Sequence, residues 1–194
     1  MIRGDLSQRL IHLTRDLNEV SGEERFKQIM ESKQINGGSN DIRGGYKCIC
    51  FSEAPISELG QIIAKNDSEI RYSPFGFMFS KDYLYKIGAR PVIYQSHEEY
   101  DLLNDEIKYK HVKFDLSNSK KMDWSWEREW RLKTDKLIIT PEDVTLIVPN
   151  RQFIEDLKDK NYETNIAYSI IELWAAERFD WHFIVLEDLG YDFI

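Results

Sequence analysis

Short stretches in which apolar and polar residues alternate, separated by glycine and proline, run along most of this chain. Because successive side chains of a strand point to opposite faces, such stretches predict half-buried β-strands, and short apolar runs bounded by turn residues predict buried ones. We expect strands or strand-like segments at Leu10–Thr14, Tyr46–Ser52, Phe75–Phe79, Pro91–Tyr94, Trp124–Leu132, Val144–Val148 and Trp181–Leu186.

Between these strands, apolar residues recur at helical spacing. The clearest helix runs from Glu23 to Ser32, with Ser21 as N-cap and Glu24 three residues later as in a capping box, and we expect it to stop near Gly37-Gly38. Further helices are expected at Ser57–Lys65, Lys81–Ile87, around His97–Tyr100 and at Gln152–Lys158, and Ile166–Ala176 is another candidate.

The order of these elements decides the fold class. Strands outnumber clean βαβ units, and no glycine-rich phosphate loop of the P-loop or Rossmann type occurs. We therefore predict an α+β fold with mixed, mainly antiparallel sheets flanked by helices. The chain has 194 residues, of which 42% are hydrophobic, and it contains no long low-complexity linker and no internal repeat. It is thus expected to form a single domain spanning residues 1–194.

Composition narrows the location of the protein. No stretch approaches about 18 consecutive apolar residues, and Met1–Asp5 lacks the basic start and apolar run of a secretory signal. We therefore expect a cytoplasmic protein with no membrane partner. Cys48 and Cys50 are expected to be buried thiols, because C-x-C with four scattered histidines fits neither a disulfide framework nor a metal site.

The charge balance bears on nucleic-acid binding. A net charge of −8 argues against broad attraction to phosphates. Lysines nevertheless cluster before the tryptophan-rich segment, at Lys108, Lys110, Lys113, Lys120 and Lys121. A local groove for a single nucleic-acid strand is one interpretation of this cluster, and a solvated charged loop is the other.

The segment Trp124–Leu132 carries the main candidate chemistry. Its even positions are mostly apolar and its odd positions are polar, so a strand would bury three indole rings and project Glu127 and Glu129 together from the other face. Two carboxylates held side by side raise each other's pKa and suit stabilisation of a cation-like transition state. The alternative is a solvated outer face on which Arg131 and Lys133 neutralise the glutamates.

Several motifs resemble known families. His12-Leu-Thr14 on a first strand, followed by a helix, resembles the opening of DarT-type DNA ADP-ribosyltransferases and related phage-defence proteins. Cys50-Phe-Ser-Glu53, Gly88-Ala-Arg-Pro-Val-Ile-Tyr94 and Glu127-Arg-Glu-Trp-Arg131 look more like abortive-infection proteins of the AbiGi type. These resemblances span residues 10 to about 132 and imply an ADP-ribosyltransferase-like fold.

The resemblance also implies roles for individual residues. Enzymes of that superfamily carry a His or Arg on the first strand, then a Ser-, Thr- or Tyr-containing element, then a late strand with Glu-x-Glu. By the resemblance, His12 and Thr14 would contact the adenosine ribose side of NAD, and Ser52 would support the nicotinamide pocket. Glu129 would hold the ribose, and Glu127 would position or deprotonate the acceptor. The chain lacks a clear Ser-Thr-Ser run on its second strand, which leaves open which glutamate is the principal acid.

Three further residues are candidates for binding NAD. Arg43 would clamp the pyrophosphate, because a guanidinium matches phosphate oxygens, and Tyr72 and Phe75 would stack on nicotinamide or on a base. The structural alternatives are a surface position for Arg43 and a core position for the two rings. His12 and Ser52 have structural alternatives too, as a satisfied core histidine and as turn chemistry.

These observations support three hypotheses. The leading one is an NAD-dependent ADP-ribosyltransferase-like enzyme that modifies nucleic acid or protein in a toxin or phage-defence system, with a neutralising antitoxin as a candidate partner. The second is a metal-independent nuclease that uses His12 and Glu129 as acid and base. The third is a non-catalytic interaction or antitoxin module that binds a partner through its acidic surface.

Overall fold

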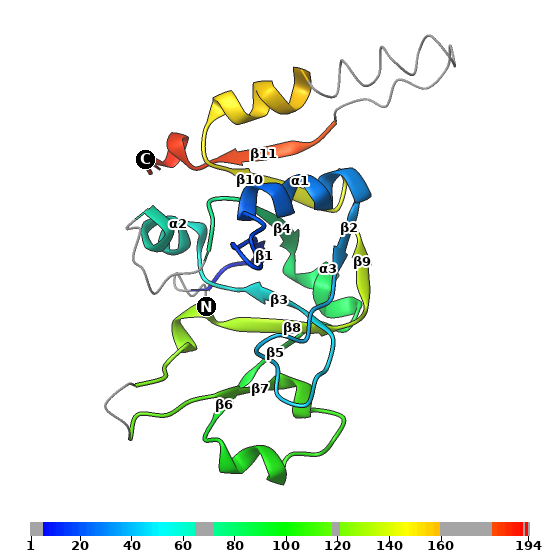
Figure 1. Ribbon diagram of the computed structural model, residues 1–194, viewed down its shortest axis with the longest axis vertical. Helices are drawn as coiled ribbons and strands as arrows, with labels where there is room; N and C mark the ends of the chain where they lie inside the picture. The colour runs from blue at the N-terminus through cyan, green and yellow to red at the C-terminus, as the bar shows by residue number, and fades with distance from the viewer. Residues whose placement is uncertain (1–5, 65–71, 118–120, 160–179, 192, 194) are drawn as a thin grey trace.

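The computed structural model describes residues 6–64, 72–117, 121–159, 180–191 and 193. Its main feature is a seven-stranded sheet in the order β11-β10-β4-β1-β3-β8-β5, mostly antiparallel, in which the β10–β11 pair is parallel (Figure 1). The strands are β1 (Arg9–Leu13), β3 (Cys48–Ser52), β4 (Gly76–Ser80), β5 (Arg90–Pro91), β8 (Glu129–Lys133), β10 (Val144–Val148) and β11 (His182–Val185). The predicted α+β class with a mixed, mainly antiparallel sheet is therefore confirmed.

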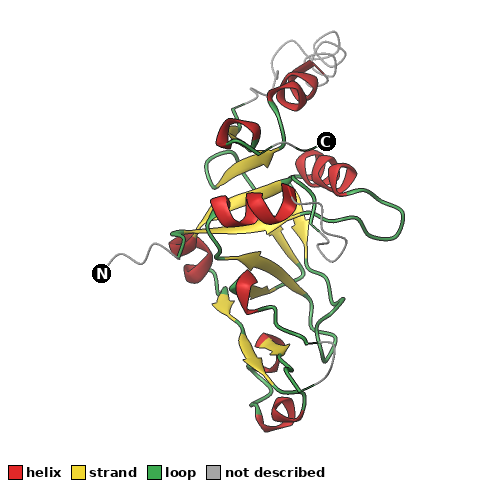
Figure 2. Ribbon diagram, turned by 90° about the vertical axis from the view of Figure 1, so that its left-hand side faces the viewer, coloured by secondary structure: helices red, strands yellow, loops and turns green. Residues whose placement is uncertain are grey.

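Two small sheets lie beside the main one. β2 (Gln34–Asn36) pairs with β9 (Lys136–Ile138), and β6 (Ile93–Gln95) pairs with β7 (His111–Lys113). Together with the 3-10 turns η1 (Glu98–Leu102) and η2 (Lys108–Lys110), β6 and β7 form a lower lobe beneath β8 in Figure 1. Figure 2 shows this lobe from the side, at the lower end of the molecule.

The lower lobe corrects two predictions. Pro91–Tyr94, predicted as one strand, is divided between two sheets, because Arg90–Pro91 pairs with β8 and Ile93–Gln95 pairs with β7. The helix expected around His97–Tyr100 is the 3-10 turn η1. Neither change can be recognised from local periodicity, because the partners of both strands lie far along the sequence.

The helices are α1 (Gly22–Ser32), α2 (Ile56–Ala64), α3 (Lys81–Lys86) and residues 151–159. The predicted capping box is confirmed: the Glu24 amide donates to Ser21 Oγ at 3.1 Å, and the Ser21 amide donates to Glu24 Oε2 at 3.0 Å. The predicted end of α1 near Gly37-Gly38 is wrong. Lys33 ends the helix in the left-handed conformation, with φ 50°, and β2 starts at the next residue.

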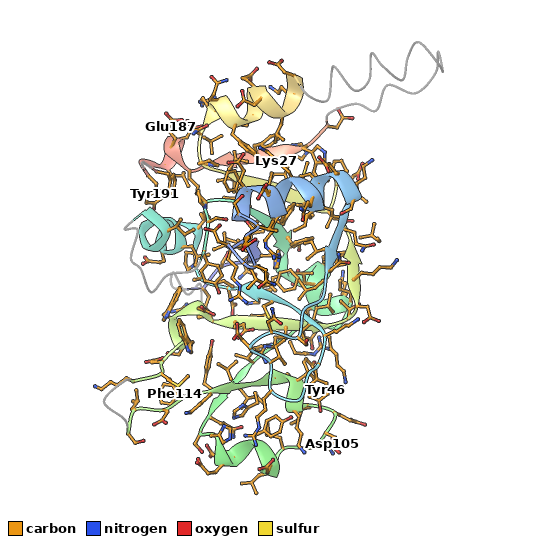
Figure 3. The ribbon with its side chains drawn as sticks, in the orientation of Figure 1. Lys27, Tyr46, Asp105, Phe114, Glu187 and Tyr191 are labelled. Carbon is orange, nitrogen blue, oxygen red and sulfur yellow. The ribbon has the colours of Figure 1, made fainter. Side chains whose placement is uncertain are left out.

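The main sheet is covered by apolar residues on both faces. The larger core contains Phe26 of α1, Phe77 of β4 and Trp130 of β8. The smaller core contains Ile11 of β1 and Leu59 of α2, among other residues. Figure 3 shows Tyr191 beside α2, where its hydroxyl donates to the Ser57 carbonyl at 2.8 Å.

The register of β3 and β8 decides which of their residues face which core. Directly opposed residues of an antiparallel pair share a face. Phe51 lies opposite Trp130 and both belong to the larger core. Cys50 opposite Arg131 and Ser52 opposite Glu129 therefore share the other face of the sheet.

Among the described residues, no helix is both long enough and apolar enough to cross a membrane. The helix proposed at Ile166–Ala176 and the lysine at position 120 lie outside the described residues.

Candidate active site

The chain bends sharply just before β8. Residues Ser125–Glu127 form a 3-10 turn, Arg128 adopts the left-handed conformation with φ 47° and ψ 51°, and the strand begins only at Glu129. The prediction of one strand over Trp124–Leu132, with three tryptophans on one buried face, is therefore wrong.

The three indole rings have different surroundings. Trp130 is buried in the larger core, Trp126 is half-buried against the smaller core, and Trp124 remains 37% exposed. Alternation along the sequence indicated one face for all three. The bend at Arg128 interrupts that alternation, so the rings do not form a common support for the glutamates.

Glu127 lies at the end of the 3-10 turn, and its side chain is half-buried. Tyr72 donates its hydroxyl hydrogen to Glu127 Oε1 at 3.0 Å. Burial and, second, the negative charge of Glu129 raise the pKa of Glu127 to about 7, against the opposing effects of the Tyr72 hydrogen bond and the positive charges of Arg15 and Arg131. Glu127 thus exchanges a proton near neutral pH.

Glu129 is held by a fork of hydrogen bonds. Arg131 Nε donates to Glu129 Oε1 at 2.7 Å, and Arg131 Nη2 donates to Glu129 Oε2 at 3.2 Å. Both side chains are nearly enclosed, at 11% exposure for Glu129 and 5% for Arg131. The same guanidinium donates through Nη1 to the carbonyls of Tyr109 and His111 in the lower lobe, at 2.7 Å and 3.1 Å.

The burial of Arg131 shows that the alternative interpretation of the sequence is wrong for this residue. That interpretation placed it on a solvated outer face with Lys133, and Lys133 is indeed exposed, but Arg131 is buried under the lower lobe. A bidentate guanidinium–carboxylate pair fixes geometry as well as charge. Glu129 is consequently the member of the acid pair whose orientation is fixed by an arginine, and Glu127 is the member whose pKa is raised to about 7.

Two more groups line the acid pair. The Glu129 amide donates to the hydroxyl of Tyr94 at 3.0 Å, and burial is the main cause that raises the pKa of Tyr94 to about 12. Burial also raises the pKa of Cys50 well above its usual value, and the adjacent Glu129 carboxylate adds to that rise. Both groups stay protonated at neutral pH, so they act as neutral polar neighbours.

Ser52 lies next to the acids but contacts backbone. Its hydroxyl donates to the Glu127 carbonyl at 2.6 Å and accepts from the Ala54 amide at 3.1 Å. The resemblance assigned this residue to the nicotinamide pocket. In the structure its only donor hydrogen is used by the backbone of Glu127, so Ser52 supports the acid pair rather than presenting a free hydroxyl.

His12 and Thr14 lie at the neighbouring strand β1 and its end. The His12 ring packs 6.0 Å from Phe51 and 6.4 Å from Phe77, on the face of the larger core, and its Nδ1 lies 2.9 Å from the Cys50 carbonyl. Burial lowers the pKa of His12. The buried Thr14 hydroxyl bonds Ser73 and donates to the Phe75 carbonyl. The partners of His12 and Thr14 in these bonds are backbone carbonyls and Ser73, and none of them is one of the two acids.

Two proposed cofactor residues are occupied elsewhere. Phe75 is buried between Phe26 and Phe153, with ring centroids 5.5 Å and 4.8 Å away, so its ring is not available to stack on a ligand. Arg43 lies 3.9 Å over the Tyr100 ring and donates to the His97 carbonyl at 2.6 Å, which ties its loop to the lower lobe. We therefore leave Phe75 and Arg43 out of the site.

Among the residues around the acids, sequence reasoning passed over Arg15, and it considered Arg131 only as a solvated counter-charge to the glutamates. The charge of Arg15 acts on both His12 and Glu127, and its guanidinium donates to Asp41 at 3.1 Å. Arg15 directly follows the His12-Leu-Thr14 motif, which is the signal that could have identified it. The positions of Tyr94 and Arg131 beside the acids depend on how the lower lobe folds onto β8, so local sequence patterns do not place them there.

The lysine cluster is partly neutralised in the structure. Lys108 forms an ion pair with Asp105 at 2.7 Å, and Lys113 forms one with Asp115 at 3.4 Å. These pairs reduce the positive charge that the lysines offer to a nucleic-acid strand.

Comparison with known proteins adds nothing to this geometry, since no family model, no curated protein and no solved structure matches the chain. What the site can do must therefore be argued from its residues. It combines one carboxyl group that titrates near neutral pH, one carboxylate locked by an arginine, and three neutral polar groups from Tyr72, Tyr94 and Cys50.

Proposed function

We propose that this protein is an ADP-ribosyltransferase-like enzyme that transfers ADP-ribose from NAD to a nucleic-acid or protein acceptor, in a toxin or phage-defence role. The observation that carries the proposal is the unequal pair of neighbouring carboxylates, with Glu129 locked by Arg131 and Glu127 protonatable near pH 7. Pairs of acids whose surroundings separate their roles are typical of sites that cleave glycosidic bonds.

Transfer makes two demands that this pair meets. The bond between C1′ of the ribose and the nicotinamide nitrogen breaks, its electron pair leaves with nicotinamide, and an oxygen or nitrogen of the acceptor forms the new bond to C1′. Positive charge develops on the sugar as the bond breaks, and fixed negative groups stabilise it. The proton lost by the acceptor goes to the Glu127 carboxylate and from there to water.

Glu129 remains able to hold the ribose although Arg131 binds it. A carboxylate offers about four lone-pair positions, and the fork from Arg131 uses one on each oxygen. The remaining positions suit ribose hydroxyl groups. Because Arg131 is itself fixed by carbonyls of Tyr109 and His111, Glu129 is already oriented before any substrate arrives.

The other residues fit NAD in part. The guanidinium of Arg15, whose charge acts on Glu127, suits the pyrophosphate and replaces Arg43 in that role. The Tyr72 hydroxyl donates a hydrogen bond to Glu127, and the Tyr72 ring is suited to stack on the nicotinamide end of NAD. His12 packs on the face of the larger core, and Thr14 braces the segment around Ser73, so neither is assigned a contact with NAD.

The nuclease hypothesis is less well supported by the geometry. It needs His12 and Glu129 to exchange protons on the same substrate, but His12 packs on the face of the larger core and Glu129 lies on the other face of the sheet. An acid and a base for one reaction must reach the same atoms.

Incubation of the full chain with isotopically labelled NAD and separate pools of single-stranded DNA, RNA and protein tests the proposal. We expect label transfer that Glu129→Gln lowers by about 10²-fold or more, the scale for loss of one preorganised charged group. Glu31→Gln, at an exposed glutamate of α1, is the matched control and should retain full transfer.

Three other outcomes would reject the proposal. RNA cleavage without NAD would favour the nuclease. A stable complex with a protein partner and no transfer to any acceptor would favour the interaction module. Equal transfer by wild type and by Glu129→Gln would remove the acid pair from the chemistry.

A further inference from the structure

The direction of the Glu127 side chain depends on an unusual backbone conformation. Arg128, between the two acids, has φ 47° and ψ 51°. An L-residue with a Cβ atom rarely adopts this left-handed region, because Cβ approaches the following carbonyl oxygen. The conformation persists only where the surrounding contacts impose it.

Two adjacent residues at the end of β3 supply those contacts. The Ser52 hydroxyl donates to the Glu127 carbonyl at 2.6 Å, and the Glu53 amide donates to the Arg128 carbonyl at 3.2 Å. Consecutive carbonyls of the bend are thus held by Ser52, the last residue of β3, and by Glu53, which follows it. The Arg128 amide closes the turn by donating to the Ser125 carbonyl at 3.2 Å.

The bend gives the two acids different orientations. Glu129 stays in the ladder of β8, opposite Ser52. Glu127 lies outside the strand, where its carboxylate accepts the hydroxyl hydrogen of Tyr72. If β8 continued back through Arg128, Glu127 would be a strand residue on the same face as Glu129, and its position relative to Tyr72 would change.

We propose that Ser52 and Arg128 are positioning residues, which together hold the bend that aims the Glu127 carboxylate at Tyr72 and away from the β8 ladder. For its consequence in catalysis this inference rests on the proposed function. The placement of the Glu127 carboxylate does not rest on the proposed function, and it can be measured in the protein without substrate.

The first test compares Ser52→Ala with Ser52→Thr. The Glu127 carboxyl group is titrated by carbon NMR in the full chain, with Glu127→Gln used to assign its signal. We expect the wild-type midpoint near 7. In Ser52→Ala the carboxyl group gains water, so its midpoint should fall by at least about one pH unit. Ser52→Thr keeps the hydroxyl and should restore the wild-type midpoint.

The second test compares Arg128→Asn with Arg128→Val. Both substitutions remove the guanidinium, and the new side chains are similar in size. Asn tolerates the left-handed region, whereas the β-branched Val does not. The Glu127 midpoint should therefore stay near its wild-type value in Arg128→Asn and fall in Arg128→Val.

Neither test alters a charged or titratable side chain other than Arg128 itself. The charged and titratable groups that act on Glu127 include Glu129 and Arg131 from β8, Tyr72 from the segment before β4, Tyr94 from β6 and Arg15 after β1. All of these are unchanged in the Ser52 variants, so a shifted midpoint reports a changed position of Glu127. Circular dichroism confirms that each variant is folded.

Several results would overturn the inference: an unchanged Glu127 midpoint in folded Ser52→Ala, equal shifts in the Ala and Thr variants, or equal shifts in the Asn and Val variants. The outcome is independent of NAD. If the midpoints move as expected but wild type transfers no label, the proposed function fails and the positioning role stands. If wild type transfers label, Ser52→Ala should lower kcat by about 10-fold or more while KM changes little.

Discussion

Glu53 and Glu127 lie close together in this fold, yet their surroundings differ. Glu53 is buried on the side of the larger core, where it forms an ion pair with Lys81 and accepts a hydrogen bond from Trp130 Nε1 at 3.0 Å. Glu127 lies on the other side of β3 and β8, where it accepts a hydrogen bond from the phenol of Tyr72 and lies near a second carboxylate, Glu129.

The surroundings of Glu53 suit a role in stability, and those of Glu127 suit a role in proton transfer. A buried carboxylate that receives both an ammonium group and an indole N–H is compensated, and its removal leaves a charge without a partner. A carboxylate beside another carboxylate has its protonated form favoured, which suits proton transfer near neutral pH. We therefore expect substitutions at Glu53 to act on stability and substitutions at Glu127 to act on activity.

The largest effect is expected for Glu53→Gln. Loss of the carboxylate charge leaves the partly buried ammonium group of Lys81 without its counter-ion, which should lower the free energy of unfolding by about 3 kcal/mol. Urea denaturation of the full chain measures this, with the exposed Glu31→Gln as a control that should stay within about 0.5 kcal/mol of wild type. A loss below about 1 kcal/mol would show that the Glu53 ion pair is not a structural tie.

Glu127→Gln should give the reverse result. ADP-ribosyl transfer should fall by about 10²-fold, because the acceptor's proton loses its base. Stability at neutral pH should not fall, since the substitution removes a group whose ionisation opposes burial. Transfer assays and urea denaturation on the same preparation check both statements. A destabilisation as large as that of Glu53→Gln would erase the distinction between the two carboxylates.

The pH dependence of stability gives a third test. The folded-state pKa of Glu127, about 7, lies above the usual 4.5, so the folded state keeps a proton that the unfolded state has already lost. Stability from this group is therefore complete below about pH 4.5 and is lost as the pH rises through 7. After allowance for solvent screening, the loss is about 2 kcal/mol.

Urea denaturation at several pH values between these limits measures that loss. The decline should be smaller by this amount in Glu127→Gln and unchanged in Glu31→Gln. Parallel curves for wild type and Glu127→Gln would refute the raised pKa.

The smallest effect is expected for Tyr72→Phe. The Tyr72 hydroxyl donates to Glu127 and favours its charged form, so its loss should raise the Glu127 pKa further. Stability should fall by about 1 kcal/mol, as for a single hydrogen bond. Carbon NMR titration of the Glu127 carboxyl group gives the direction of the shift. A lower midpoint in Tyr72→Phe would mean that burial, rather than the phenol, changes in this variant.

Local patterns in the sequence were enough for much of the framework. The capping box of Ser21 and Glu24, and the strands β3 and β10, follow from residues that are neighbours in sequence and act through short-range geometry. The acid pair, Glu127 and Glu129, could also be identified from the local sequence. Such features depend on periodicity and on side chain to backbone contacts within one turn, which are written directly in the order of residues.

The unequal roles of the two acids were decided only by the tertiary structure. Arg128 bends the chain because Ser52 and Glu53 hold its carbonyl and that of Glu127, and Arg131 is buried because the lower lobe covers it. Ser52 and Glu127 are separated by 75 positions in the chain. No local preference of an arginine indicates a left-handed backbone or a buried fork, since the free energy that stabilises both comes from contacts that exist only after the distant strands have paired.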